Sequence, residues 1–405
     1  MSVKDKFINY VKIDTESDPH SGVTPSTEKQ YELLNLLLKE LQSLNIESKL
    51  EKGYVYGHLK SNLDYKCKTV GYIAHVDTSP DYSGKDVKPK VISNWDGSDI
   101  NLGHGKVTSL KDFPHMSEFV GDDIIVTDGS TLLGADDKAG VAIIMEHLEY
   151  LVKNPDIKHG DIKVCFTPDE EIGKGTVAFD VDYFNADFAY TLDGDKVNVF
   201  AYETFNAYSI DVDIEGVAVH PGGAKNKLVN AINLANKFDS LLPVSARPEY
   251  TENYEGFNHL HTISGSAASV KMGYIIRNHD NNIIQKQIDT FNRIAEFIND
   301  DLGYKAIKLN IELSYKNMYE ILKDQKEVID IAVKAIENSG LKVEIEAIRG
   351  GTDGSHLTFM GLPCPNLGTG GTNYHGPYEA CSINQMEKAC EVVMNVTKIV
   401  SELKV

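Results

Sequence analysis

The sequence predicts an α/β fold in two parts: a domain built on a mostly parallel sheet, and an α+β domain inserted into it. Three observations support this. The length of 405 residues exceeds what a single hydrophobic core usually holds. Short apolar runs alternate with helical patterns over residues 1–202, which is typical of parallel α/β sheets. From residue 203 apolar and polar residues alternate, as they do in half-exposed antiparallel strands.

A helix and a buried strand come early in the chain. Ser26 or Thr27 is placed to cap the helix. Its apolar residues recur at helical spacing: Tyr31, Leu34, Leu38 and Leu41. The run of residues 70–76 is short, partly β-branched and bounded by Pro80, so it predicts a buried strand. Residues 80–127 are rich in Gly, Asp, Pro and Ser and predict loops and hairpins, with short strand-like runs such as DDIIVTD.

Two further strands with a helix before them complete the first part. The segment DDKAGVAIIMEHLEYLV predicts a helix, and Asn154-Pro155 is its stop signal. The segments DIKVCFTPDEE and FAYTLDGD predict buried strands that end in acidic residues. Strand–helix–strand order of this kind predicts a largely parallel sheet.

The inserted domain is predicted to span residues 203–310. Its expected elements are the strand AYSIDVDIEGVAVH, a helix around NKLVNAINLANKF, strands within HTISGSAASVKMGYIIR, the helix IIQKQIDTFNRIAEFIND and the strand IKLNIELSY. A helix in KEVIDIAVKAIENSG, the strand LKVEIEAI and a C-terminal amphipathic helix then resume the earlier pattern. Residues 1–202 and 311–405 therefore form the surrounding domain.

Composition excludes several function classes. The chain carries 40 Lys and Arg against 60 Asp and Glu, a formal net charge of −20, which opposes non-specific nucleic-acid binding. Its N-terminus has no apolar signal region, and no segment approaches the ~20 apolar residues of a membrane span. The 5 cysteines are scattered without CxxC pairs. We therefore expect reduced thiols and a cytoplasmic protein with neither nucleic-acid nor membrane partners.

Histidines and carboxylates gather at the predicted strand ends. They are His75, Asp77, Asp136, Asp137, Glu170, Glu171, Asp193 and His375. Because residues two apart in a strand point the same way, His75 and Asp77 should emerge on one side of the sheet. Open α/β sheets place their ligands at this carboxyl edge, so we expect the whole set to converge there.

The convergence indicates a metal centre. Taken singly, an acidic pair at a helix start is an ordinary cap, and a Glu pair is usually a solvated turn. Taken together, so many carboxylates would repel one another without bound cations. Two His and at least three carboxylates without Cys suit Zn²⁺, with Co²⁺ or Mn²⁺ as alternatives. Two ions fit better than one, because the ligands exceed the three of a single open catalytic zinc site.

The ordered motifs resemble a known family. HVD, GADDKAG, PDEEIG, LDG, VHPG and RGGTDGS…NYHGPYE together resemble the M20 (aminoacylase/carboxypeptidase G2-like) co-catalytic metallopeptidases, over essentially the whole chain. Further segments are most similar to the family's tripeptide aminopeptidases: the 80–127 insertion, ETFNAYSI, VHPGGAKNKLVNA, YEGFNHL, MGYIIRNHD and IRGGTDGSHLTFMGLPCPNLGTGG. The departures are conservative. The resemblance implies release of the N-terminal residue from tripeptides, and a ferredoxin-like lid as the inserted domain.

The resemblance also implies a ligand set. His75 and Asp193 would hold one Zn²⁺, Glu171 and His375 the other, and Asp136 would bridge both, with a cis bond to Asp137. Asp77 would accept a hydrogen bond from the second ring nitrogen of His75 and so fix its tautomer. Glu170 would be the general base that takes a proton from water and passes it to the leaving amine.

Substrate contacts are implied less sharply. His220 would complete the oxyanion site when the domains close, although a turn role before Pro221 is an equal alternative. Arg277 and Arg349 are candidate clamps for a peptide's C-terminal carboxylate. Asn206 is a further candidate for holding substrate. Surface roles stay open for these three residues.

Other functions share the same metal core. A dipeptidase, a carboxypeptidase and an N-acyl amino-acid deacylase would each use it, and only the resemblance favours tripeptides as the main partners. A non-catalytic metal-binding homologue belongs to a different class, and Glu170 argues against it because such a protein needs no general base. A homodimer stays an open alternative to the monomer.

Overall fold

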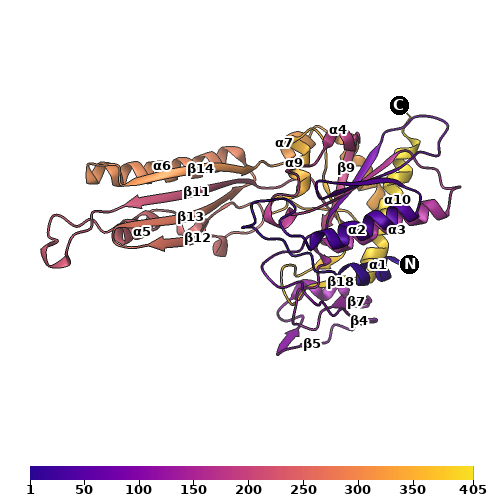
Figure 1. Cartoon of the computed structure of the whole chain (residues 1–405), viewed down its shortest axis with the longest axis horizontal. Helices are drawn as coiled ribbons and strands as arrows, with labels where there is room; N and C mark the ends of the chain where they lie inside the picture. The colour runs from indigo at the N-terminus through magenta and orange to yellow at the C-terminus, as the bar shows by residue number, and fades with distance from the viewer. Residues whose placement is uncertain (405) are drawn as a thin grey trace. The chain divides into compact units, whose positions relative to one another are not determined.

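The structure, a computed structural model that describes residues 1–404, divides the chain into two units (Figure 1). The first comprises Met1–Tyr202, Met318–Glu346 and the chain from Thr352 onward; the second comprises Glu203–Asn317 and Ala347–Gly351. The boundary predicted at residue 310 lies inside strand β14 (Ile307–Tyr315), which pairs along its length with β11 (Asn206–Glu215). A strand in the middle of such a pairing stays with its partner, so the chain leaves the second unit only after Asn317.

A mixed, mostly parallel sheet forms the centre of the first unit, and the predicted α/β fold is confirmed. Within residues 1–404 its order is β1 (Glu47–Glu51), β2 (Tyr54–Leu59), β8 (Ile162–Thr167), β3 (Val70–His75), β9 (Phe188–Gly194), β16 (Asn366–Gly368), β10 (Val199–Ala201) and β15 (Glu344–Ile345). The neighbours β8, β3, β9 and β16 run parallel, whereas β2 and β10 are antiparallel to β8 and β16. Every residue of β3 is buried, as its continuous apolar run predicts.

Helices surround this sheet. They are α1 (Val3–Tyr10), α2 (Gln30–Ser43), α3 (Ala135–Lys153), α4 (Val181–Phe184), α7 (Tyr319–Leu322), α8 (Lys326–Asn338), α9 (Asp353–Phe359) and α10 (Ile383–Glu402). Helix α3 packs on β3 and β9 and also contacts α1 and α10, so its apolar faces lie in the main core. Among residues 1–404, no helix has both the length and the apolar character of a membrane span.

The predicted cap of α2 is wrong. Lys29 precedes the helix and no side chain caps it. The Ser26 hydroxyl donates instead to Asp169, a partner distant in sequence that a local pattern does not reveal. Leu33 and Leu37 are fully buried, whereas Tyr31 and Leu38 are only partly covered.

The segment 80–127 forms hairpins, as predicted, but it also joins a second sheet. This sheet has the order β17 (Gly371–Thr372), β18 (Ala380–Ser382), β7 (Ile124–Val126) and β4 (Lys90–Ile92). The same segment also contains a two-stranded hairpin of β5 (Ile100–Gly103) and β6 (Lys106–Thr108). Trp95, Met116 and Phe119 contribute to a local apolar cluster. Because β18 pairs with β7, the loop between β17 and β18, which carries His375, has a fixed base.

The second unit has ferredoxin-like βαββαβ order. Its elements are β11, α5 (Ala231–Ser240), β12 (Phe257–Gly265), β13 (Ser269–Asn278), α6 (Asn281–Leu302) and β14, and the antiparallel sheet has the order β12-β13-β11-β14 (Figure 1). Along β11, Ile210, Val212 and Ile214 are buried in a core that includes residues of both helices, while Asp211 and Asp213 are exposed. The period-two alternation of the sequence thus has its expected physical basis.

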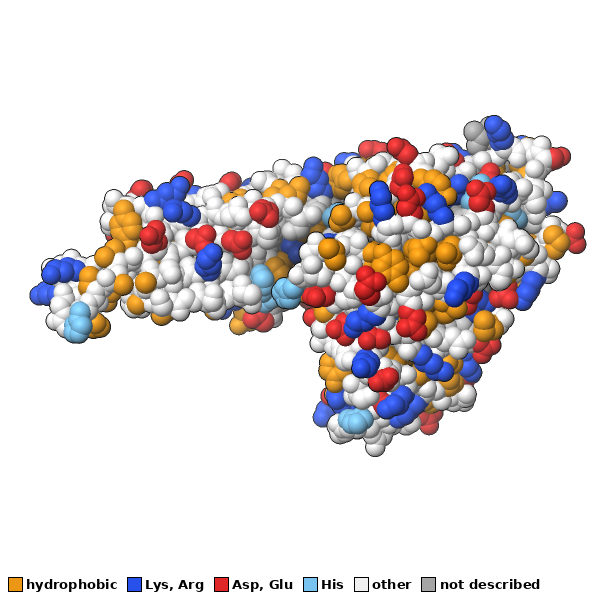
Figure 2. Space-filling view, in the orientation of Figure 1, with side chains coloured by type: hydrophobic (Ala, Val, Ile, Leu, Met, Phe, Trp, Pro, Cys, Tyr) orange, Lys and Arg blue, Asp and Glu red, His pale blue; other side chains and the backbone are white. Residues whose placement is uncertain are grey.

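Charges of both signs are interspersed on the face of the molecule seen in Figure 2. Over the whole chain the acidic residues outnumber the basic ones, 60 to 40.

Candidate metal centre

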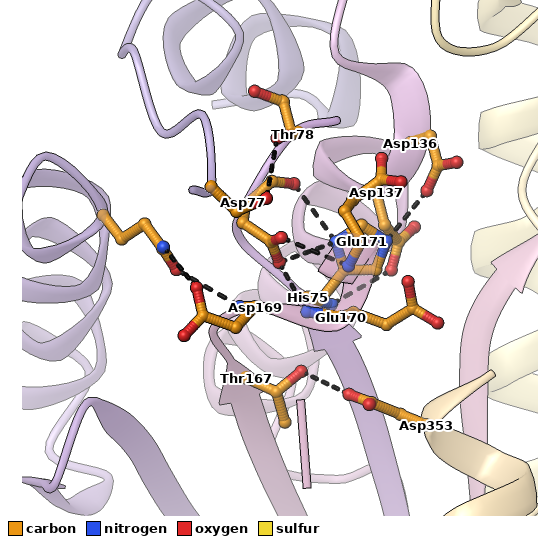
Figure 3. A network of polar contacts seen from close by, with 12 residues as sticks. His75, Asp77, Thr78, Asp136, Asp137, Thr167, Asp169, Glu170, Glu171 and Asp353 are labelled. Carbon is orange, nitrogen blue, oxygen red and sulfur yellow. Dashed lines mark hydrogen bonds and ion pairs between the residues drawn. The ribbon is translucent and has the colours of Figure 1, made fainter. Parts of the chain in front are cut away.

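The end of β3 presents a histidine with an oriented ring. His75 is 2% and Asp77 0% exposed. The Nδ1 atom of His75 lies 3.1 Å from the Asp77 carbonyl oxygen and 3.3 Å from Asp77 Oδ1 (Figure 3). Because only acceptors face Nδ1, this nitrogen carries the proton, and Nε2 points to Asp136 Oδ1 at 2.8 Å and Asp193 Oδ1 at 3.7 Å. A ring nitrogen between two carboxylates needs a cation or a proton there.

Asp136 and Asp137 have opposite surroundings at the start of α3, where the bond between them is cis. Asp136 faces both histidines: besides the His75 contact, its Oδ2 lies 3.4 Å from His375 Nε2. Asp137 is buried and accepts from the backbone N–H groups of His75 and Gly140 at 3.3 and 3.2 Å. A Cβ at Gly140 would lie 2.0 Å from a backbone oxygen, so only glycine fits beside Asp137.

The turn after β8 holds Glu170 and Glu171. Asp77 Oδ1 and Oδ2 accept from their backbone N–H groups at 3.0 and 3.2 Å. Glu171 Oε2 lies 2.9 Å from His375 Nε2, and its buried Oε1 has no hydrogen-bond partner within residues 1–404. The carboxylate of Glu170 is partly exposed and likewise accepts no hydrogen bond from the described chain. Asp77 thus contacts the ring of one candidate ligand and the backbone of another (Figure 3).

These side chains fit divalent cations. Two ligands that share a metal at ~2.0–2.1 Å in tetrahedral geometry are about 3.4 Å apart, and the contacts between histidine and carboxylate atoms span 2.8 to 3.7 Å. Ligand atoms of His75, Asp136 and Glu171 lie within 4.8 Å of one another, as do those of His75, Asp137 and Asp193. Since both Asp137 oxygens already accept backbone N–H groups, Asp136 is the better ligand of the pair.

Electrostatics support the same interpretation. Burial raises the pKa of Glu171 to about 8, with the Asp136 charge adding to it, and burial raises the pKa of Asp193 to about 6. Contacts with Asp136 and Glu171 raise the pKa of His375 to about 11. Burial disfavours the charged form of His75, yet contacts with three carboxylates raise its pKa well above the ordinary value. The site therefore attracts positive charge strongly.

Sequence reasoning missed three buried carboxylates that brace this site. They are Asp169, Asp353 and Glu379. Asp169 accepts from Ser26 N–H and from Gln30 Nε2, each at 2.7 Å, and so ties the turn carrying Glu170 to the N-terminal segment. Asp353 accepts from Thr167 Oγ1 at 2.7 Å (Figure 3). The only sequence signal for these three carboxylates is that they stand next to other motif residues in the chain, because their hydrogen-bond partners are distant in sequence.

Two of the candidate substrate-binding residues have their donors occupied within the second unit. The terminal nitrogens of Arg349 donate to the carbonyls of Asn253 and Glu255 at 2.6 and 2.7 Å and to Thr251. Asn206 is buried; its Nδ2 donates to the carbonyls of residues 278 and 279, and its Oδ1 accepts from the N–H of residue 317. These contacts tie the second unit's chain segments together.

The other two candidates, His220 and Arg277, also belong to the second unit. Arg277 lies on β13, where its Nη1 donates to the carbonyls of Tyr208 and Ile276, and its guanidinium lies over the Tyr315 ring. The Nδ1 of His220 accepts from Gly222 N–H at 3.1 Å, as a turn histidine does.

Comparison with known proteins defines the class. A model of peptidase family M20/M25/M40 matches residues 127–398. The chain belongs to this family of peptidases, and the resemblance seen in the motifs is confirmed.

Relatives at nearly half sequence identity share one name. The chain is 48% identical to peptidase T of Clostridium perfringens, over 99% of each chain, and 49% identical to peptidase T of Staphylococcus aureus, over 98% of each. Its fold is similar to the crystal structure of a tripeptidase from Staphylococcus aureus, with a TM-score of 0.79, 25% identity and coverage of 99% of this chain and 98% of that one.

Proposed function

We propose that this protein is an aminopeptidase that releases the N-terminal residue of tripeptides with two divalent metal ions. The observation that carries the proposal is Asp136, which presents one oxygen to each of two histidines. A carboxylate in this position suits a bridge between two cations. The relatives named peptidase T and the similar structure described as a tripeptidase support the substrate class.

The contacts support a division of ligands. His75 and Asp193 would hold one ion, Glu171 and His375 would hold the other, and Asp136 would contribute to both. Zn²⁺ is our first choice because the donors are imidazole and carboxylate; Co²⁺ and Mn²⁺ suit the same donors. When bound, the ions would polarise the scissile carbonyl and lower the pKa of a bound water towards neutrality. Asp77 holds the His75 ring through Nδ1, so that Nε2 stays available as a ligand atom.

Glu170 is the proposed general base. Its backbone is held by Asp77 while its carboxylate accepts no hydrogen bond from residues 1–404, so the carboxylate is free to exchange protons. It takes a proton from the attacking water and delivers it to the nitrogen of the leaving amine.

The second unit supplies the proposed substrate contacts. Arg277 is the preferred clamp for the C-terminal carboxylate, because its carbonyl contacts use Nη1, whereas both terminal nitrogens of Arg349 donate to backbone and threonine oxygens. Asn206 is the weaker candidate, because its Nδ2 donates to two backbone carbonyls. His220 remains the proposed oxyanion donor.

Peptide length tests the function directly. The acidic centre attracts the N-terminal ammonium, and a cation that holds the C-terminal carboxylate favours one length. We expect tripeptides to be cleaved with a higher kcat/KM than di- or tetrapeptides, and a C-terminally amidated tripeptide to be a poorer substrate. The measurement is chromatographic analysis of digests of a homologous peptide series, with N-terminally blocked peptides as control. Equal cleavage of free and amidated tripeptides would contradict the clamp, whereas cleavage of blocked peptides would favour a carboxypeptidase or deacylase.

Arg277→Ala should lower kcat/KM for tripeptides by about ten- to a hundredfold, because a hydrogen bond to a charged group contributes ~1.5–3 kcal/mol. The loss should be much smaller for the amidated tripeptide, which lacks the charge. Arg247→Ala is a matched control, since it removes an arginine of the same unit that pairs with Asp239 at 2.8 Å. Equal losses with both peptides would show that Arg277 does not bind the carboxylate.

A further inference from the structure

We propose that Glu379 is a positioning residue that locks the two metal-binding loops, carrying Asp136 and His375, into one arrangement. The proposal rests on the proposed function for the identity of the ligands, and it adds a residue with no part in the chemistry itself. Glu379 is 1% exposed, and its carboxylate touches the backbone beside Asp136 rather than any candidate ligand atom.

Three backbone N–H groups converge on this carboxylate. Oε2 accepts from Leu133 and Gly134 at 2.7 and 2.8 Å, and Oε1 accepts from Asp136 at 3.1 Å. Successive N–H groups near a left-handed residue form a concave anion site, and Gly134 has φ +82°. The N–H of Asp136 itself is therefore held by Glu379, one bond from the Cα that bears the ligand carboxylate.

Glu379 also holds the backbone where α3 begins. The helix begins after Gly134, which has no side chain, and the first N–H groups of a helix have no partner within it. Of these N–H groups Glu379 accepts that of Asp136, whose backbone dihedrals are non-helical, while Asp137 accepts that of Gly140. The helix start, where Asp136 lies, is thus fixed by a residue more than two hundred positions away in the sequence.

The other end of the lock is the His375 loop. The N–H of Glu379 donates to the carbonyl of Gly376 at 3.2 Å, which closes a turn directly after His375. The next residue, Ala380, pairs with Val126 in β18 and β7, so the position of Glu379 is set by the sheet. Glu379 therefore links the paired strands β18 and β7 to both metal-binding loops. The candidate ligands on these loops, Asp136 and His375, lie 3.4 Å apart.

Glu379→Gln tests the lock with little change in shape. The amide oxygen can replace one carboxylate oxygen, but the NH₂ group then faces a backbone N–H, donor against donor. We expect Zn²⁺ affinity, measured by competition with a chromophoric chelator, to fall about 10- to 100-fold, as for other residues that orient metal ligands. In the Zn²⁺-loaded enzyme, kcat should fall while KM for a tripeptide stays within about twofold.

Ser382→Ala is the matched control, at the end of the strand β18 that directly follows Glu379. The Ser382 hydroxyl is buried, donates to Asp122 and caps α10 through Gln385 N–H, so its loss should also lower the unfolding temperature. It should leave Zn²⁺ affinity and kcat unchanged. Zn²⁺ affinity and kcat of Glu379→Gln within about twofold of wild type, or equal losses in Ser382→Ala, would overturn the proposal.

Gly134→Ala tests the same proposal at the backbone that donates to Glu379. It provides the decisive measurement if Glu379→Gln does not fold. A Cβ there meets no atom closer than 3.4 Å, so only the left-handed backbone conformation is disfavoured. We expect losses of Zn²⁺ affinity and kcat in the same direction, and wild-type values would refute the lock. Zn²⁺ affinity is measured without substrate. It therefore tests the role of Glu379 even if the wild-type enzyme does not cleave tripeptides.

Discussion

Replacing Glu170 by Gln should lower kcat for a tripeptide by about 10²- to 10⁴-fold while both metal ions stay bound. General-base catalysis typically contributes a factor of this size. Burial and the charge of Asp193 raise the pKa of Glu170 well above its ordinary value, so this carboxyl readily accepts a proton. The glutamine keeps the size of the side chain and its backbone contact with Asp77, but it has no basic oxygen. Steady-state kinetics and metal analysis on one preparation measure both effects.

Glu146→Gln serves as the control for this substitution. Glu146 lies on α3 and pairs with Lys6 at 2.8 Å, so the change removes a carboxylate of the same unit that our mechanism does not use. Its kcat should match wild type. Near-normal turnover of Glu170→Gln would mean that another group accepts the proton.

Removing the metal ions with a chelator should abolish peptide release and lower the unfolding temperature. Asp136, Glu171 and Asp193 crowd around two histidines, and without cations their charges must be neutralised by protons. A ligand at a hundred times its dissociation constant stabilises the folded state by about 2.7 kcal/mol, so the two ions together should shift the transition by several degrees. Adding Zn²⁺, Co²⁺ or Mn²⁺ back should restore both properties, and metal analysis should give close to two ions per chain.

His75→Ala and His147→Ala separate metal loss from simple destabilisation. Both histidines are 2% exposed, but His147 contacts Thr397 instead of the carboxylate cluster. Only His75→Ala should weaken metal binding, although both variants should unfold at lower temperature. A fully active preparation that contains one ion or none would exclude the two-metal mechanism.

Much of the centre could be predicted from local patterns. The apolar run before His75 identifies a buried strand, and its end determines where His75 and Asp77 emerge. The acidic pair after β8 follows the same logic, because β3 and β8 are parallel and bring their carboxyl ends to one edge. The pair at the start of α3 comes after β7 of the second sheet, so the parallel-strand rule does not place it. The metal-binding interpretation needed only the kinds of residue at these ends and their order.

Some local expectations failed where a distant residue competed. Ser26 was expected to cap α2, yet its hydroxyl serves the buried Asp169. Arg349 and Asn206 stay predicted substrate contacts, and in the structure they donate to backbone oxygens of their own unit, which residue type alone did not indicate. Buried polar groups take whichever partner the fold brings near, and that choice has no signature in the local sequence.

The sequence by itself therefore determined the class of fold, the insertion and the residues that converge at the strand ends, since periodicity and residue type act over a few positions. The family resemblance already named Asp136 as the bridging ligand. Only the tertiary structure decided that both Asp137 oxygens accept backbone N–H groups, and that Glu379 holds the N–H of Asp136. The physical reason is that hydrogen-bond geometry at a buried site depends on segments hundreds of residues apart. The distances between these segments become defined only when the chain has folded around the buried site.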